Sequence, residues 1–177
     1  MRSARMRGGI PTPVVLVAHG SRDPRAAEAI EDLVRAVATE RPGVDVRASY
    51  LDHTEPTPEQ VLYALESAGH RKAVLVPLLL TDAYHGRVDI PGVLTAARAG
   101  GLRLSVRVTE VLGPSGGVVD DLLLAGLRRR LAEVAPAEVD DGPAIARVDA
   151  IVLAAAGTRD AGARRVVEVA AAALGGS

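Results

Sequence analysis

The chain has 177 residues, a formal net charge of −1 and 48% hydrophobic residues. This length and apolar content suit a globular domain with a proper core, and the near-neutral charge offers no basic surface for nucleic acid. Cysteine, phenylalanine and tryptophan are absent and there are three tyrosines, which excludes disulfides, thiolate metal sites and aromatic base-stacking platforms.

Predicted strands and helices alternate along the chain. Apolar runs predict strands at residues 13–18, 44–51, 73–80, 102–109 and 150–155, and helical spacing predicts helices at 24–40, 58–68, 90–99, 118–134 and 161–174. Ser21 or Asp23 is expected to cap the first helix and Asp89 the third. The run "AVLVPLLL" is typical of a strand buried on both faces of a parallel sheet.

This alternation predicts an α/β, flavodoxin-like fold, a parallel sheet with helices on both faces. In the usual order of such a sheet the first strand lies between the second and the third. Ligands bind beyond the carboxyl ends of the strands, so functional residues are expected in the loops that follow strands.

A repeat divides the chain. The segment "AIVLAAAGTRDAGARRVVEVAAAA" has the outline of "VVLVAHGSRDPRAAEAIEDLVRAV". We therefore expect a complete lobe at 13–134, a polar linker at 135–147, and the first strand and helix of a second, degenerate lobe at 148–177. Residues 1–12 are basic, lack a signal peptide's apolar stretch, and are expected to form a flexible tail.

The location and assembly of the chain are further expectations. No apolar run reaches the ~20 residues of a membrane span, and the lack of cysteine permits a cytoplasmic location. The apolar faces of the 148–177 unit need cover, so it is expected to pack on the first lobe or to be exchanged within a homodimer.

His19 is the strongest functional candidate. It ends the first predicted strand, and the turn that follows it, Gly-Ser-Arg-Asp, is repeated as Gly-Thr-Arg-Asp at 157–160. The second copy has Ala156 where the first has His19, so the turn does not need the histidine. This contrast indicates that His19 serves a function.

His85 follows the third predicted strand, next to the first in the expected order. The two histidines are therefore expected to face each other across one cleft, and paired imidazoles suit Fe²⁺, Co²⁺, Ni²⁺ or Zn²⁺ better than Mg²⁺ or Ca²⁺. Asp52 follows the second strand and could add a hard ligand or a proton acceptor. His53 could line the cleft but is expected to be simply solvated, and His70 is assigned no chemistry.

Three arginines flank the histidines. Arg22 and Arg87 could bind carboxylates through their guanidinium forks, whereas Arg25 is expected to be a surface charge. The stretch "GPSGG" at 113–117 fits the pattern of a hydrolase nucleophile, but Pro114 is awkward in that turn and no histidine follows it. Ser115 is therefore interpreted as a helix cap.

The stretches "LVAHGSRDP", "SYLDHTEP" and "VPLLLTDAYHGRVDIP" together resemble the sirohydrochlorin chelatases, class II enzymes that insert iron or cobalt into a tetrapyrrole. The resemblance covers residues 14–134. It implies flavodoxin-like lobes, with the tetrapyrrole held between two of them, and His19 and His85 as the catalytic and metal-binding pair. The family usually has Glu where this chain has Asp52.

The resemblance implies insertion of Co²⁺ or Fe²⁺ into sirohydrochlorin without a nucleotide, in siroheme or cobalamin synthesis, with Ni²⁺ or Zn²⁺ possible in vitro. No nucleotide-binding motif is present. Arg22 and Arg87, with Ser21 and Tyr84, are expected to bind the substrate carboxylates. Two alternatives stay open: a metal- or tetrapyrrole-binding module without turnover, and a histidine phosphotransfer enzyme that uses His19.

Overall fold

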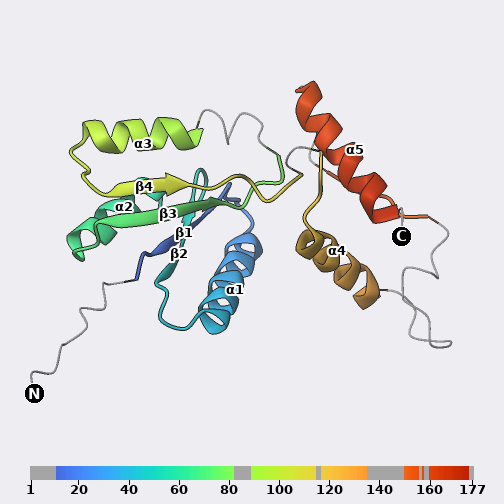
Figure 1. Cartoon of the computed structure of the whole chain (residues 1–177), viewed down its shortest axis with the longest axis horizontal. Helices are drawn as coiled ribbons and strands as arrows, with labels where there is room; N and C mark the ends of the chain where they lie inside the picture. Colours follow the sequence, from blue (N-terminus) through green and yellow to red (C-terminus); the bar gives the residue numbers. More distant parts are fainter. Residues whose placement is uncertain are drawn as a thin grey trace, which may run out of the picture. The chain divides into compact units, whose positions relative to one another are not determined.

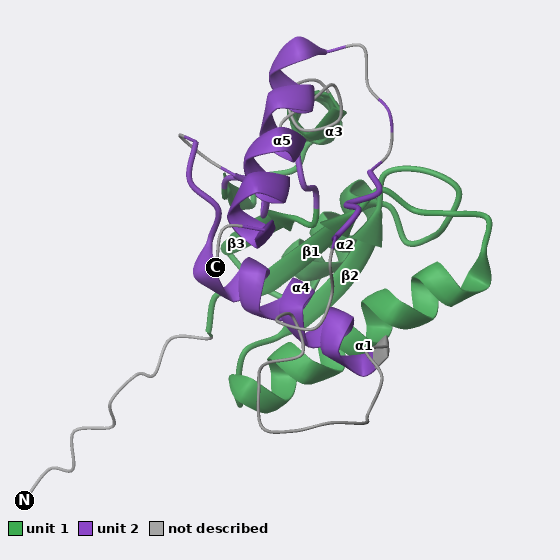
Figure 2. Ribbon diagram, turned by 90° about the vertical axis from the view of Figure 1, so that its right-hand side faces the viewer, with its two compact units in different colours: residues 1–78, 88–109 green, residues 79–87, 110–177 purple. Residues whose placement is uncertain are grey.

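The computed structural model describes residues 11–81, 89–114, 117–134, 150–155, 157 and 160–175 (Figure 1). The chain forms two compact units, residues 1–78 with 88–109 and residues 79–87 with 110–177 (Figure 2). Among the described helices, none is both long and apolar enough to cross a membrane.

Unit 1 contains a four-stranded parallel sheet in the order β2-β1-β3-β4. The predicted fold class and the central position of the first strand are thus confirmed. In Figure 1, α1 lies on one face of the sheet and α2 and α3 lie on the other. The elements of this unit are β1 (Val14–Ala18), α1 (Pro24–Glu40), β2 (Val46–Tyr50), α2 (Pro58–Ser67), β3 (Lys72–Pro77), α3 (Ile90–Ala99) and β4 (Ser105–Val108).

The core of unit 1 is aliphatic, as the composition requires. Val15 and Val17 of β1 and Leu75 of β3 are fully buried, because a central strand is covered on both faces. Tyr50, the last residue of β2, is 2% exposed and packs with Ala18 against α1.

Local hydrogen bonds set the starts of the helices. Asp23 caps α1 by accepting from the amide of Arg25 at 3.0 Å. Thr57 and Gln60 form a reciprocal capping box at α2. The prediction for Asp89 is wrong, because this residue already has helical backbone angles and makes no capping hydrogen bond to α3.

Unit 2 contains α4 (Asp121–Val134) and α5 (Ala161–Gly175), which pack against each other. The two helices share an apolar cluster built on Val119, Leu124 and Leu174. Helix α4 begins at Asp121 rather than at 118, because the Asp120 carboxylate accepts from the amide of Leu122 and ends the preceding loop.

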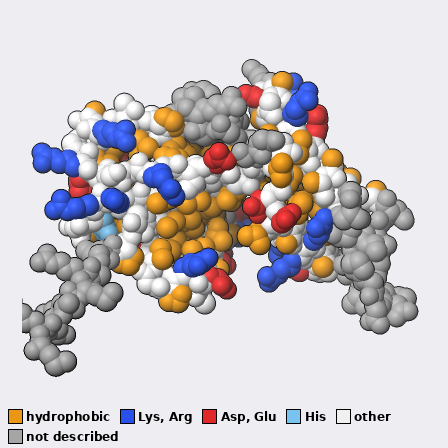
Figure 3. Space-filling view, viewed as in Figure 1, with side chains coloured by type: hydrophobic (Ala, Val, Ile, Leu, Met, Phe, Trp, Pro, Cys, Tyr) orange, Lys and Arg blue, Asp and Glu red, His pale blue; other side chains and the backbone are white. Residues whose placement is uncertain are grey.

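The predicted strand at 150–155 is wrong, since these residues are irregular. Ile151 packs on the α4–α5 cluster instead. A strand requires a neighbouring strand, and no described strand lies in this segment's own unit. Apolar side chains also stay on the surface, among them Val118, Leu122 and Val152 at 71%, 81% and 89% exposed. Figure 3 shows such side chains gathered between charged ones.

Candidate functional site

His19 follows β1 directly, at the carboxyl edge of the sheet where a ligand site was expected. Its ring is partly buried, and Nδ1 lies 3.3 Å from the carbonyl oxygen of Gly20. In the tautomer that donates from Nδ1 to this carbonyl, the lone pair is on Nε2. In this tautomer His19 can accept a proton or ligate a metal through Nε2.

Gly20 lets the loop after β1 touch the loop after β2. Its φ is +95°, and a Cβ at this position would lie 1.7 Å from the backbone oxygen of Asp52. No side chain fits this contact. Glycine is therefore needed for the close approach of the two loops, and not only for the sharp turn.

Hydrogen bonds hold the same two loops together. The amide of Asp52 donates to the carbonyl of His19 at 2.8 Å. The hydroxyl of Thr54 donates to the carbonyl of Ser21 at 3.0 Å. These bonds continue the pairing of β1 with β2 beyond the strands, and they fix His19 relative to the 52–54 loop.

His53 lies beside His19 as a result. The two ring centres are 6.5 Å apart and the ring planes are inclined by 37°. The Asp52 carboxylate accepts from the amide of His53 at 2.8 Å, and its second oxygen lies 3.4 Å from His53 Nε2. Sequence reasoning expected a solvated His53, yet the predicted strand order already places the second loop beside the first.

Of the other predicted site residues, three are described by the structure and three lie outside the described residues. The Ser21 hydroxyl accepts from the amide of Asp23 at 3.1 Å, which gives it a structural role in the turn. Arg22 is exposed. Asp52 contacts His53, as described above. Tyr84, His85 and Arg87 lie outside the described residues, as does Ser115 of the hydrolase-like motif.

Arg25 is a surface charge, as predicted. Its guanidinium pairs with the Asp23 carboxylate, and its side chain is 84% exposed. Hydrogen bonds from Arg25 hold the pKa of Asp23 below its ordinary value. This pair therefore supports the start of α1 and leaves Arg22 as the arginine of the turn without an assigned structural role.

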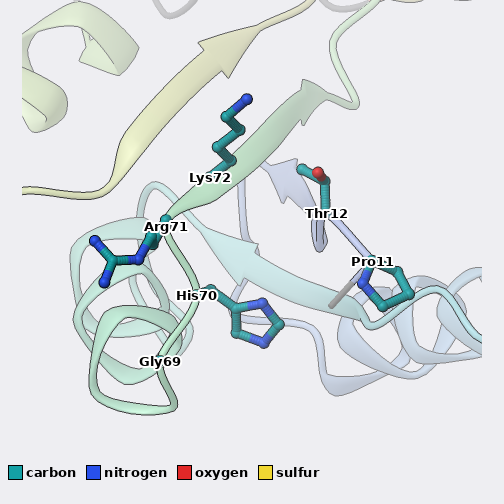
Figure 4. Close-up of a pocket in the computed structure, with 6 residues that line it drawn as sticks. All are labelled: Pro11, Thr12, Gly69, His70, Arg71 and Lys72. Atoms are coloured by element: carbon teal, nitrogen blue, oxygen red, sulfur yellow. The ribbon is translucent and has the colours of Figure 1, made fainter. Parts of the chain in front are cut away.

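His70 lies at the opposite end of the strands. A cavity of about 260 Å³ there is lined by Pro11, Thr12, Gly69, His70, Arg71 and Lys72 (Figure 4). His70 Nε2 is 3.8 Å from an oxygen of Asp45, which in turn binds Arg47.

Within the described residues, no three His, Asp or Glu side chains are grouped so that they could hold a metal ion. The described part of the site therefore offers at most two such ligands at one place. A metal bound there keeps several coordination positions for other ligands.

Comparison with known proteins agrees with this fold. Residues 13–133 match the model of the CbiX family. A sirohydrochlorin cobaltochelatase of Methanosarcina acetivorans is 30% identical over 87 residues, which are 49% of this chain and 67% of that protein. One from Methanopyrus kandleri is 32% identical over 81 residues, 46% of this chain and 57% of that protein. The chain thus spans only about three fifths of these curated relatives.

Solved structures show the same fold. A CbiX protein from Marinobacter aquaeolei VT8 superposes with a TM-score of 0.58 at 24% identity, over 70% of this chain and 96% of that one. The sirohydrochlorin chelatase SirB from Bacillus subtilis, in complex with cobalt, gives a TM-score of 0.61 at 23% identity, over 71% of this chain and 51% of that one. On the strength of the match to residues 13–133, this chain belongs to the CbiX family.

Proposed function

We propose that this chain inserts a divalent metal ion, Co²⁺ or Fe²⁺, into sirohydrochlorin without ATP. The observation that carries the proposal is the position of His19 at the carboxyl end of β1, in a chain that matches the CbiX family over residues 13–133. The names of the relatives supply the substrate, since those from Methanosarcina acetivorans and Methanopyrus kandleri are sirohydrochlorin cobaltochelatases.

The chemistry requires a group that binds a metal and accepts protons near neutral pH. Metal insertion removes two pyrrole protons from the macrocycle, and a neutral imidazole can perform either task. In this proposal His19 is the principal base and ligand, and His85 is the second ligand. β3, which precedes His85 in the sequence, pairs directly with β1, which precedes His19.

The remaining site residues bind the substrate in this proposal. Sirohydrochlorin carries several carboxylates, and arginine binds carboxylates through two parallel hydrogen bonds. We assign this role to Arg22 and Arg87, with Ser21 and Tyr84 as further polar contacts. The exposed side of Arg22 in the turn after β1 agrees with contact to a large, charged ligand.

An anaerobic insertion assay tests the proposal. Purified protein is mixed with sirohydrochlorin and Co²⁺ or Fe²⁺, with and without ATP, and the absorption change of the macrocycle is followed. We expect ATP-independent insertion that His19→Ala and His85→Ala each reduce by about 100-fold or more. His70→Asn, at the opposite end of the sheet, serves as the matched control and should keep its rate.

Two further measurements on the same protein, tetrapyrrole binding and hydrolysis of phosphate esters, separate the alternatives. Saturable tetrapyrrole binding with no insertion above background would favour a binding module. Hydrolysis of phosphate esters that is abolished by His19→Ala and unaffected by His85→Ala would favour a phosphotransfer enzyme. Either result would overturn the chelatase proposal.

We further propose that residues 148–177 are the beginning of a second, degenerate lobe, and that this segment associates with a second copy of the chain. The side chain of Val152 in this segment is 89% exposed, which supports an association that covers it. Light scattering of the full chain should give the mass of a dimer. A monomer at all accessible concentrations would contradict this assembly.

A further inference from the structure

We propose that His53 joins His19 in a two-imidazole site that binds the divalent metal ion before the macrocycle arrives. The inference rests on the proposed function for the identity of the ion. It assigns a new role to His53, which belongs to the loop after β2 and not to either of the expected catalytic positions. The site lies wholly within unit 1 and uses only described residues.

The distance between the two rings is slightly larger than one shared ion requires. A divalent metal lies about 2.1 Å from an imidazole nitrogen, which itself lies about 1.1 Å from the centre of its ring. Two imidazoles on one ion therefore have ring centres about 5.2 Å apart in tetrahedral geometry and about 6.4 Å apart in linear geometry. The observed separation of 6.5 Å exceeds the tetrahedral value by about 1.3 Å, so side-chain rotations bring the two rings closer when both bind one ion.

The orientation of each ring is set by a second partner. An oxygen of the Asp52 carboxylate lies 3.4 Å from His53 Nε2, and in the tautomer with its proton on that nitrogen the lone pair of His53 is on Nδ1. The carbonyl of Gly20 lies beside Nδ1 of His19, and in the tautomer with its proton on Nδ1 the lone pair of His19 is on Nε2. A carboxylate or carbonyl behind a histidine is the usual support of a metal-binding imidazole. Asp52 thereby acts as a positioning residue for His53.

The backbone holds His53 in an uncommon conformation. Its φ is +59°, in the left-handed region that residues other than glycine rarely adopt. The Asp52 carboxylate accepts from its amide, and the Asp52 amide is bonded to the carbonyl of His19. The two imidazoles are thus connected through a short, bonded piece of main chain, and their approach does not depend on flexible side chains alone.

Two protein ligands suit a metal ion that has to be transferred to the macrocycle. The His53 side chain is 34% exposed, which gives an ion access from solvent. Two imidazoles leave further positions on the ion for His85, the other ligand of the proposed function, and for the nitrogens that will receive the ion. Imidazole ligands also favour Co²⁺ and Fe²⁺ over the more abundant Mg²⁺.

The test measures metal binding by the full chain in the absence of any tetrapyrrole. Co²⁺ is titrated anaerobically and followed by calorimetry and by visible absorption, whose bands report on the ligands. His53→Asn is the variant of choice, because asparagine tolerates the left-handed backbone and cannot replace the imidazole under these conditions. We expect it to weaken Co²⁺ binding at least tenfold and to change the visible bands. His70→Asn is the matched control and should bind like the wild type.

Asp52→Asn separates positioning from ligation. The amide oxygen of this variant can still accept from the amide of His53, while the oxygen beside the His53 ring is lost, so we expect a loss of only a few-fold in affinity with the same bands. Unchanged Co²⁺ affinity in His53→Asn, with a folded protein by circular dichroism, would overturn the inference. Zn²⁺ titration followed by histidine NMR provides an independent readout, in which the rings of His19 and His53 should shift together.

The outcome is independent of turnover. Metal insertion that proceeds while His53→Asn binds Co²⁺ normally would overturn the two-imidazole site and leave the proposed function standing. A His53-dependent metal site in a protein that inserts no metal would support the site and overturn the function. If both hold, His53→Asn should raise the metal concentration needed for half-maximal insertion and leave the saturated rate within a few-fold of wild type.

Discussion

The α-carbon of Gly20 approaches the backbone of Asp52 so closely that a Cβ would lie 1.7 Å from the Asp52 oxygen. This contact joins the loops that follow two neighbouring parallel strands, β1 and β2. It brings together a turn that carries His19 and a turn that carries His53. The geometry of the candidate site therefore depends on a position with no side chain.

Gly20→Ala is expected to destabilise the protein strongly. The new methyl group meets backbone atoms that cannot move away, and φ is +95°, so the free energy of unfolding should fall by about 3 kcal/mol or more. Gly43→Ala is the matched control. Its φ is +90° but nothing lies within 4 Å of the added Cβ, so we expect a loss of about 1 kcal/mol.

Urea unfolding followed by circular dichroism measures both Gly variants. Equal losses for Gly20→Ala and Gly43→Ala would show that backbone conformation, and not the contact with Asp52, decides the cost.

Tyr50 predicts a loss of stability at high pH. Burial raises the pKa of its phenol above the ordinary value of 10.0, with a smaller contribution from Glu31. A raised pKa in the folded state means that the stability is fully present below pH 10 and is lost as the pH rises through the folded pKa. Tyr50→Phe should therefore lose less stability than the wild type between pH 9 and 12, as measured by urea unfolding. Parallel pH profiles of the two proteins would refute this role.

Asp45 predicts a loss of stability at low pH. The hydrogen bonds from Arg47 lower the pKa of Asp45 below 3.8, with burial opposing and His70 adding a small effect. A lowered pKa means that the stability is present above about pH 4 and is lost as the pH falls. Since both side chains of the Asp45–Arg47 pair are 35% exposed, Asp45→Asn should cost only about 0.5 kcal/mol at pH 7.

The cost of Asp45→Asn should shrink in thermal unfolding as the pH falls below about 4. Asp32→Asn, in an ion pair with Arg35 whose side chains are 72% and 67% exposed, is the control and should change little at either pH. A cost that persists unchanged at pH 2 would point to lost packing instead of lost charge.

The burial of Leu174 predicts that this side chain helps to hold α5 on α4. Its side chain is 5% exposed and lies in the cluster of Val119 and Leu124, so Leu174→Ala should weaken this packing by about 2–4 kcal/mol. Hydrogen exchange of the α4 and α5 amides should accelerate, while the amides of β1 and β3 keep their protection. Val152→Ala, at a position 89% exposed, should have almost no effect. Acceleration confined to α5 would indicate that α4 is stable without it.

The sequence predicts the sheet well because its signals are local. The run 13–18 and the helix at 24–40 are bounded by a proline, a turn and an Asp cap, and the helix appears with the predicted ends. The order of β1, β2 and β3 follows from general rules for parallel sheets. The segment 150–155 has an equally apolar composition, but strand formation depends on a neighbouring strand, and composition carries no information about that neighbour.

Only part of the candidate site can be predicted from the sequence. A repeat in the sequence singles out His19, since its counterpart is Ala156. His53 gave no such signal, because its position depends on a positive φ and on the contact between Gly20 and Asp52, both of which are properties of the folded loops. Side-chain neighbours across two loops are therefore the part of the site that only the three-dimensional structure provides.

The buried position of Tyr50 gives the protein an optical signal of its own. Tryptophan is absent, so no stronger emitter hides the near-ultraviolet fluorescence of the three tyrosines. Tyr50 is 2% exposed and stands two residues before Asp52, so its ring is shielded from water and close in sequence to the proposed metal site. Paramagnetic Co²⁺ that arrives there should quench this emission, which makes loading of the unlabelled protein visible in real time.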